Sequence, residues 1–237
     1  MIKSKQKDIK VKECFKACQD SFAIHPKLIK KLKCYHDTLD PDVFFTSFMY
    51  YLQYPLSGFV EKSVFLDRTL EFVAKFACSF FEERDNANEE TKDVVIDDEL
   101  PPFLYRLFAW LLDHHEVEGA DTRLRVCQLI NKILKYMGEN ACIDDDLYNK
   151  IYDGMLDRLK DKVAEIRSQA ATALQRLQDP KDDECPITKA YLFHLVHDPN
   201  NEVLRTMCPW SWCHQAVSFL HPEVDSRYGL CEESSFI

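Results

Sequence analysis

The sequence predicts an all-α protein built as an α-solenoid, a superhelical stack of antiparallel helix pairs. Gly occurs 5 times and Pro 10 times in 237 residues, so turns are few and helices should dominate. Apolar residues recur at steps of three and four, which is the period of a helix face. Similar amphipathic segments return at intervals of roughly 40 residues, a period typical of stacked helical repeats.

The N-terminal third, residues 1–81, predicts four helices. Residues 8–36 form two of them, divided around His25-Pro26. Asp40-Pro41 opens the third, which is expected to end before Pro55 because proline interrupts helical hydrogen bonding. The last helix carries an apolar face of Phe65, Phe72, Val73, Phe76 and Phe80.

An acidic loop, residues 82–100, is expected to separate these helices from a more regular region at 101–207. Pro101-Pro102 begins a helix rich in Leu and Phe, and the next runs from Asp121 to Met137 with Gly138 as its C-cap. The carboxylates of Asp144, Asp145 and Asp146 are expected to cap a third helix.

The segment DKVAEIRSQAATALQRLQDP, residues 161–180, is the clearest amphipathic helix of the chain. Asp161 is its expected N-cap and Pro180 its stop. Its apolar face contains several alanines, so a neighbouring helix can approach closely: Val163, Ile166, Ala170, Ala173, Leu174 and Leu177. A further helix is expected around Tyr191, Leu192, Leu195 and Val196.

Three helix starts align after polar turns, at Thr122-Arg123, Ile166-Arg167 and Val203-Leu204. An apolar residue followed by arginine at the start of the second helix of a pair is the HEAT-repeat signature. Each pair buries its apolar face only by stacking on its neighbours. The sequence therefore predicts a HEAT-repeat solenoid of about five repeats.

The net charge of −10 is unevenly distributed. Counting Lys and Arg against Asp and Glu gives +7 for residues 1–36 and −12 for 37–120, then +1 for 121–176 and −6 for 177–237. A strongly acidic chain is a poor non-specific ligand for DNA, so any nucleic-acid binding must depend on local basic patches.

Catalytic and cofactor motifs are absent from the sequence: it has no GxSxG, P-loop, GxGxxG or HExxH pattern. We expect no enzyme activity, cofactor, metal or small-molecule substrate. Cys208, Cys213, His214 and His221 lack the close pairing of zinc ligands, and His114-His115 is better explained as a polar helix end. No apolar run approaches 18 residues, so no membrane span is expected, and the ten cysteines are interpreted as reduced thiols of an intracellular protein.

Two stretches, residues 123–186 and 68–76, resemble the HEAT region of condensin complex subunit 3, with LQDPKDDECP at Leu177 to Pro186 the most characteristic run. The resemblance covers roughly residues 10–207. It implies a non-enzymatic subunit that binds the kleisin subunit of condensin and, with it, double-stranded DNA. The resemblance also implies an association with the SMC ATPase subunits through kleisin. It implies a location in the nucleus and on mitotic chromosomes, and in the cytoplasm during interphase.

The resemblance gives the basic residues of the chain a candidate role as phosphate contacts, because solenoid geometry aligns equivalent helices side by side. The alternative interpretation is a solvated helix face with local ion pairs, and for Arg167 a structural pairing with an acid of a neighbouring turn. The candidates are Lys27, Lys30, Lys31, Lys33, Lys62, Arg123, Arg125, Lys132, Lys135, Lys160, Lys162 and Arg167.

Two departures from the family pattern leave a second interpretation open. The turn after the third helix reads Phe59-Val60-Glu61-Lys62, with one lysine where the family has a basic pair. Residues 208–237 lack a helical period and are expected to form a divergent, disordered tail. The alternative is a HEAT adaptor that binds protein segments without DNA affinity.

Overall fold

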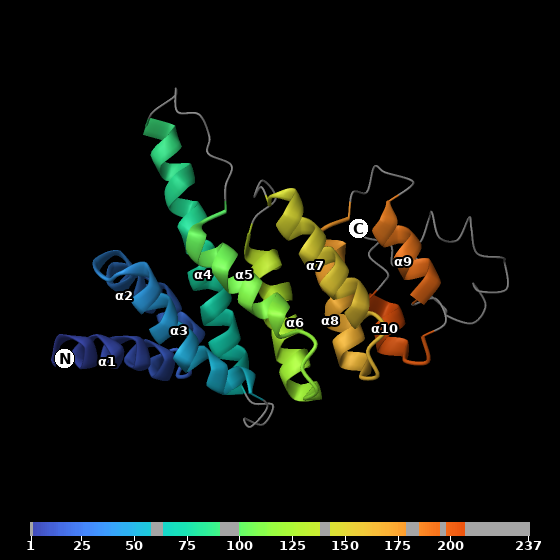
Figure 1. Cartoon of the computed structure of the whole chain (residues 1–237), viewed down its shortest axis with the longest axis horizontal. Coiled ribbons are helices and arrows are strands. Elements are labelled where there is room, and N and C mark those ends of the chain that lie inside the picture. Colours follow the sequence, from blue (N-terminus) through green and yellow to red (C-terminus); the bar gives the residue numbers. More distant parts are fainter. Residues whose placement is uncertain are drawn as a thin grey trace, which may run out of the picture.

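A computed structural model of the chain shows a row of helices that follow one another along the long axis of the molecule (Figure 1). Helices account for nearly all of the described part, which contains no β-strand, so the predicted all-α class is confirmed. The structure describes residues 2–57, 64–90, 100–137, 143–178, 185–194 and 198–206.

Apart from the short 3-10 helix η1, the described elements alternate as the first and second members of successive helix pairs. They are α1 (Ile2–Ala17), η1 (Phe22–Ile24), α2 (His25–Thr38), α3 (Pro41–Leu56), α4 (Val64–Glu90), α5 (Pro102–Asp113), α6 (Ala120–Tyr136), α7 (Asp145–Arg158), α8 (Ala164–Gln175), α9 (Pro186–His194) and α10 (Asn201–Thr206).

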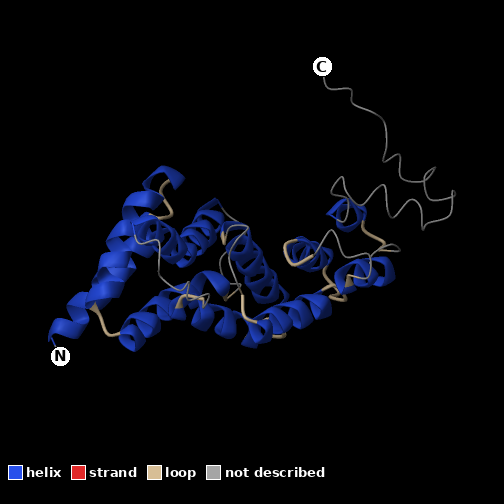
Figure 2. Cartoon of the chain, turned by 90° about the horizontal axis from the view of Figure 1, so that it is seen from above, coloured by secondary structure: helices blue, strands red, loops and turns tan. Residues whose placement is uncertain are grey.

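The pairs stack so that the helices form two rows (Figure 2). In one row α4 packs between α2 and α6, α6 packs on α8, and α8 packs on α10. In the other row α1 packs on α3, and α5 packs on α7. We call these the second-helix row and the first-helix row. Because each pair is covered by its neighbours, the arrangement is the predicted α-solenoid.

An aromatic cluster around Phe103 packs the third helix pair against the first two pairs. The Phe103 ring at the start of α5 has its centroid 5.1 Å from Phe48 of α3 and 5.3 Å from Phe76 of α4. It also lies 6.0 Å from the imidazole of His36, near the end of α2. Rings meeting edge to face at these separations are favourable beyond the apolar area that they bury.

α6 is the central helix of the stack and is buried on more than one side. It contacts α3, α4, α5 and α8. The predicted face around Cys127 and Ile130 is buried, and so is a second face that contains Leu129 and Ile133. A helix surrounded in this way needs apolar residues around most of its circumference, which explains its long run of buried positions.

Two predicted helix starts match the structure and a third differs. The Asp40 carboxylate accepts from the N–H groups of Asp42 and Val43, and that of Asp144 accepts from the N–H of Leu147. The prediction that Asp161 is the N-cap of α8 is wrong, because Val163 holds that position. Asp161 lies two residues earlier and accepts from the Val163 N–H.

Two predicted helix ends are also wrong. α3 continues through Pro55 to Leu56, so this proline lies in the last turn of the helix and does not end it. α4 continues to Glu90, so the acidic loop expected from residue 82 is helical as far as that residue. Other expectations lie outside the described residues: the Gly138 cap, the Pro180 stop, Leu195 and Val196, and the tail from 208.

Phe48 provides a direct test of the aromatic core. We expect Phe48→Ala to lower the free energy of unfolding by about 3–5 kcal/mol, because the ring is fully buried and contacts Phe15, Phe76 and Phe103. Chemical denaturation followed by circular dichroism measures the change. Tyr50→Ala, on the exposed side of the same helix, is the control and should change stability by less than about 1 kcal/mol. Equal effects of the two substitutions would contradict the packing described.

Candidate functional site

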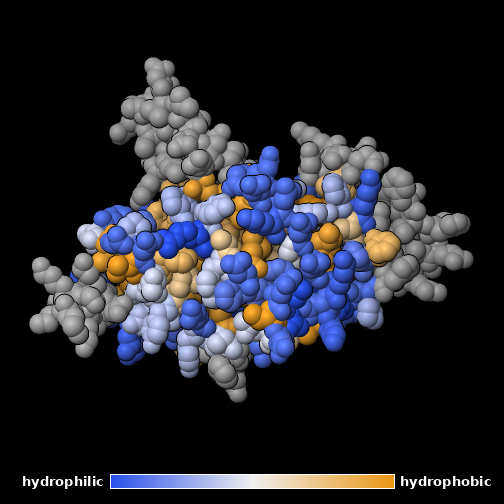
Figure 3. All heavy atoms as spheres, in the orientation of Figure 1, coloured by the Kyte–Doolittle hydropathy of each residue, from blue (hydrophilic) through white to orange (hydrophobic). Residues whose placement is uncertain are grey.

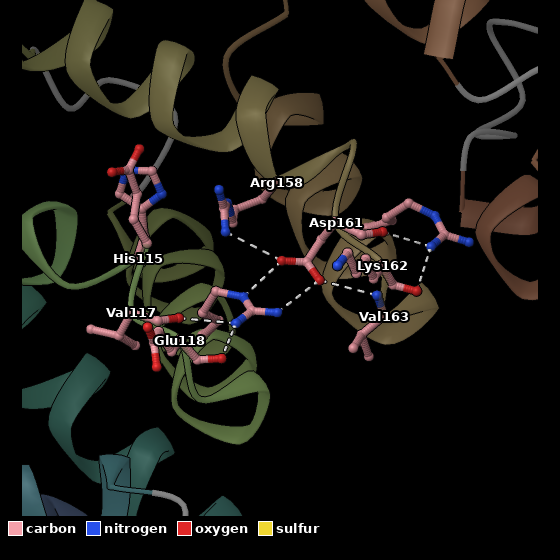
Figure 4. Close-up of polar contacts among 10 residues, drawn as sticks. His115, Val117, Glu118, Arg158, Asp161, Lys162 and Val163 are labelled. Carbon is pink, nitrogen blue, oxygen red and sulfur yellow. Dashed lines mark hydrogen bonds and ion pairs between the residues drawn. The ribbon is translucent and has the colours of Figure 1, made fainter.

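Asp161 lies at the centre of a polar cluster that joins α6, α7 and α8 (Figure 4). Its carboxylate accepts from Arg123 Nε at 2.8 Å and from Arg158 Nη1 at 3.2 Å. Arg123 also donates to the carbonyl oxygens of Val117 and Glu118, in the turn that precedes α6. The Asp161 side chain is only 3% exposed, so this ion pair is a structural element of the stack.

The same arrangement recurs one repeat later. Arg167 of α8 donates through Nε and Nη2 to the carboxylate of Asp198, at 2.6 and 2.8 Å. It also donates to the carbonyl oxygens of Asp161 and Lys162, as Arg123 does to its own preceding turn. The interpretation of Arg167 as a structural HEAT arginine is therefore confirmed. In α10 the equivalent position is Leu204. The described residues therefore contain two such pairs, Arg123–Asp161 and Arg167–Asp198, which we call the arginine–aspartate ladder.

Arginine donors hold both ladder carboxylates in the charged form. Burial alone would raise the pKa of Asp161, but the hydrogen bond from Arg123 and the one from the Val163 N–H bring the pKa below its ordinary value. The pKa of Asp198 is lowered in the same way, by Arg167 and the Asn200 N–H acting against burial. Each buried charge thus has an opposite charge and a backbone donor.

The lysines of α2 divide into free and engaged residues. Lys27 and Lys30 are exposed, with no ion pair to any other residue of the described ranges. Lys31 Nζ lies 3.3 Å from the carboxylate of Glu13 on α1. Lys33 donates to the carbonyl oxygen of Ser79 at 2.7 Å, which ties α2 to α4.

Lys132 of α6 belongs to an ion-pair network with α4. Its ammonium lies 2.9 Å from Asp67 and 3.1 Å from Glu71, and Glu71 also pairs with Lys75 at 3.1 Å. Tyr136 also donates a hydrogen bond to Glu71. Although burial raises the pKa of Glu71, these donors lower it to about 2. The Lys132 charge is therefore already neutralised within the fold.

Three of the candidate phosphate contacts have guanidinium groups that are engaged within the fold. Arg125 is 4% exposed and donates to the carbonyl oxygen of Pro55, so it cannot reach a ligand at the surface. Arg123 and Arg167 have their guanidinium groups engaged in the ladder. A signal for Arg125 was present in the sequence, because Leu129 and Ile133 follow it at steps of four on the same side of the helix.

The other predicted cations lie on the second-helix row or in its turns. Lys135 near the end of α6, and Lys160 and Lys162 in the turn before α8, are all exposed. Lys160 is 4.0 Å from the equally exposed Asp157, a weak pair. Lys62 lies outside the described residues. Hydrophilic residues dominate the view of the molecule over α6, α7 and α8 (Figure 3).

We also searched the described residues for metal sites and for membrane-spanning helices. They contain no group of three or more His, Cys, Asp and Glu side chains that could hold a metal ion, and none of their helices could cross a membrane. The His114 ring stacks on Trp110 with centroids 3.8 Å apart, whereas His115 is buried against Gly154. The sequence cluster Cys208 to His221 lies outside the described part.

The fold and the arginine–aspartate ladder define the class of the protein: it is a HEAT-repeat α-solenoid. No protein-family model matches the chain. Individual relatives match it, and they are named condensin complex subunit 3, the family that the sequence resemblance indicated.

The frog and human proteins of that name give the clearest comparison. The chain is 42% identical to condensin complex subunit 3 of Xenopus laevis over 202 residues, 85% of its own length, and 41% identical to that of Homo sapiens over 200 residues, 84% of its length. In both cases it spans about a fifth of the relative, 19%. The chain is thus homologous to one portion of a longer protein.

A solved structure supports the same assignment. The chain resembles the crystal structure of the S. pombe condensin Cnd3–Cnd2 subcomplex with a TM-score of 0.62 and 28% sequence identity. The likeness covers 82% of this chain and 22% of the solved one. The homology therefore extends to the three-dimensional fold.

Removal of the Asp161 carboxylate tests the ladder. We expect Asp161→Ala to lower the free energy of unfolding by about 3 kcal/mol or more, because it leaves the mostly buried Arg123 and Arg158 without their acid. Denaturation curves measure the loss. Asp153→Ala, at an exposed position of α7, is the matched control and should change stability by less than about 0.5 kcal/mol. A loss at Asp161 as small as at Asp153 would contradict a structural role.

The network around Glu71 predicts a pH dependence. An acid with a depressed folded-state pKa contributes stability that is complete above its ordinary pKa of about 4.3 and is lost as the pH falls through the folded value, here about 2. Wild-type protein should therefore exceed Glu71→Gln in stability at pH of about 6, and the difference should shrink steadily as the pH falls. The measurement is the free energy of unfolding of both proteins over a pH series. A difference that does not depend on pH would contradict the prediction.

Proposed function

We propose that the chain is a non-enzymatic HEAT-repeat subunit of condensin that binds the kleisin subunit and, together with it, double-stranded DNA. This role would support mitotic chromosome condensation in the nucleus, with the SMC ATPase subunits engaged through kleisin. The single observation that carries the assignment is the homology to condensin complex subunit 3 over 85% of the chain. The likeness to a Cnd3 structure solved together with Cnd2 supports kleisin as the protein partner.

The structure refines the DNA part of the proposal by separating available cations from engaged ones. Lys27, Lys30, Lys135 and Lys162 are exposed and belong to the second-helix row or its turns, so they are the favoured phosphate contacts. Lys31 and Lys160 have exposed partners, Glu13 and Asp157, that a phosphate can replace at small cost. Long flexible cations of this kind position a backbone without reading its sequence.

The alternative is a HEAT adaptor that binds protein segments and has no DNA affinity. The net charge of −10 and the internal neutralisation of Lys132 favour it. Solenoids offer extended surfaces for chain segments without any basic groove. The two functions differ in whether kleisin creates salt-dependent DNA binding.

The deciding experiment is a DNA-binding titration at several salt concentrations, with and without the kleisin segment of condensin. We expect binding that appears or strengthens with kleisin and whose logarithmic salt slope is about 0.9 per phosphate contact. The triple variant Lys27→Glu, Lys30→Glu and Lys31→Glu should lose most of the affinity and flatten the slope, yet bind kleisin as the unmodified chain does.

The control reverses charge elsewhere. Lys12→Glu and Lys16→Glu change exposed lysines of α1, in the first-helix row, and should leave DNA affinity within about threefold. An equal loss in both sets of variants would show a general charge effect and no specific site. Kleisin binding without DNA binding at any salt concentration would establish the adaptor.

A further inference from the structure

The solvent-facing side of α3 has almost no charge. Asp42 is the one acidic or basic residue in the whole helix, Pro41–Leu56. Val43, Tyr50 and Tyr54 are 53%, 71% and 68% exposed, and their spacing of seven and four places them on one side. A surface helix of a globular protein normally presents charged residues there, so α3 carries an apolar stripe on both sides.

α5, the next helix of the first-helix row, lies beside α3. Arg106 of α5 pairs with Asp42 at 2.8 Å and stacks on the ring of Phe45 at 4.2 Å, which fixes α5 beside α3. α5 in turn exposes Tyr105. We call Val43, Tyr50, Tyr54 and Tyr105 the outer aromatic surface. Tyrosine is enriched in protein interfaces because it combines a large apolar ring with one polar atom.

Exposed carboxylates outnumber exposed cations on α5 and α7, the next two helices of the first-helix row. Asp113 is the last residue of α5 and Glu116 lies in the turn after it, and both are exposed. α7, which packs on α5, exposes four aspartates, Asp145, Asp146, Asp153 and Asp157, against one exposed lysine, Lys150. This charge repels nucleic acid and anionic lipid.

The charge reverses on the other side of α3. α1, which packs on α3, exposes Lys12 and Lys16. A complementary occupant therefore has apolar anchors over α3 and basic residues toward α5 and α7. Complementary charge of this kind orients a partner and raises its association rate.

We propose that the outer aromatic surface docks a protein segment with apolar or aromatic anchors and an excess of lysine and arginine, its basic residues lying over α5 and α7. This inference goes beyond the DNA and kleisin function and does not depend on it, because it uses the first-helix row and none of the candidate phosphate contacts. Exposed tyrosines flanked by charge are the residues from which binding hot spots are made.

The probe is a fluorescein-labelled helical peptide of about 18 residues, roughly five turns, with Leu and Trp on one face and Lys elsewhere. Fluorescence anisotropy with the full chain measures its affinity. We expect the double variant Tyr50→Ser and Tyr54→Ser to bind at least about tenfold more weakly than the unmodified chain. Phe193→Ser, which removes an 82% exposed ring from α9, is the matched control and should not change the affinity.

Two further variants test the charge and guard against misfolding of the double variant. Val43→Lys adds a like charge at an exposed site and should also weaken binding of the basic peptide. Asp113→Asn with Glu116→Gln should weaken it and reduce its salt dependence. A peptide with Glu in place of Lys should bind far less well than the basic one.

Three results would overturn the proposal. One is equal affinity of the unmodified chain and of the tyrosine and Val43 variants. Another is equal binding of the acidic and basic peptides, which would remove the charge argument. The third is a concentration-dependent dimer in analytical ultracentrifugation that the tyrosine variant abolishes, since the occupant would then be a second copy of this chain.

Discussion

The buried contact between Arg123 and Asp161 sets the geometry of the second half of the molecule. A guanidinium and a carboxylate with so little exposure tolerate few arrangements, because each would carry a large desolvation penalty without the other. The pair joins α6 to the turn before α8, and Arg167 repeats the connection from α8 to Asp198. Successive repeats are thereby held in one register by charge as well as by apolar packing.

In the first half of the solenoid, aromatic packing holds successive repeats in register. There the aromatic cluster around Phe103 spans α2 to α5, and the rings interlock where the second half has an ion-pair ladder. Arg68, near the start of α4, donates to the carbonyl oxygens of Gln19 and Asp20 and so binds the turn after α1. The two halves meet at α6, which explains why that helix is buried on several sides.

Helix periodicity predicted the fold well, because an amphipathic period is a local property of the chain. Most helices follow from it, and the residue types at Asp40 and Asp144 indicate two of the helix starts. What it missed depends on neighbours distant in sequence. Asp161 resembles an N-cap, yet the guanidinium of Arg123, 38 positions earlier, holds its carboxylate. The acidic composition after residue 81 suggested a loop, although charged residues such as Glu and Arg are good helix formers and α4 continues to Glu90.

The candidate site was harder to predict, for a related reason. A basic residue in a sequence gives its charge but not the partner that already satisfies it. Arg125 and Lys132 lie on the same helix as Lys135, and only the last of the three is exposed. In a solenoid every helix has neighbours on two sides, so a cation is engaged whenever an adjacent helix offers an acid or a carbonyl at the same height. Under the proposed DNA-binding function, the expected phosphate contacts are therefore the cations left over after stacking, and the exposed lysines of α2, α6 and the turn before α8 are such residues.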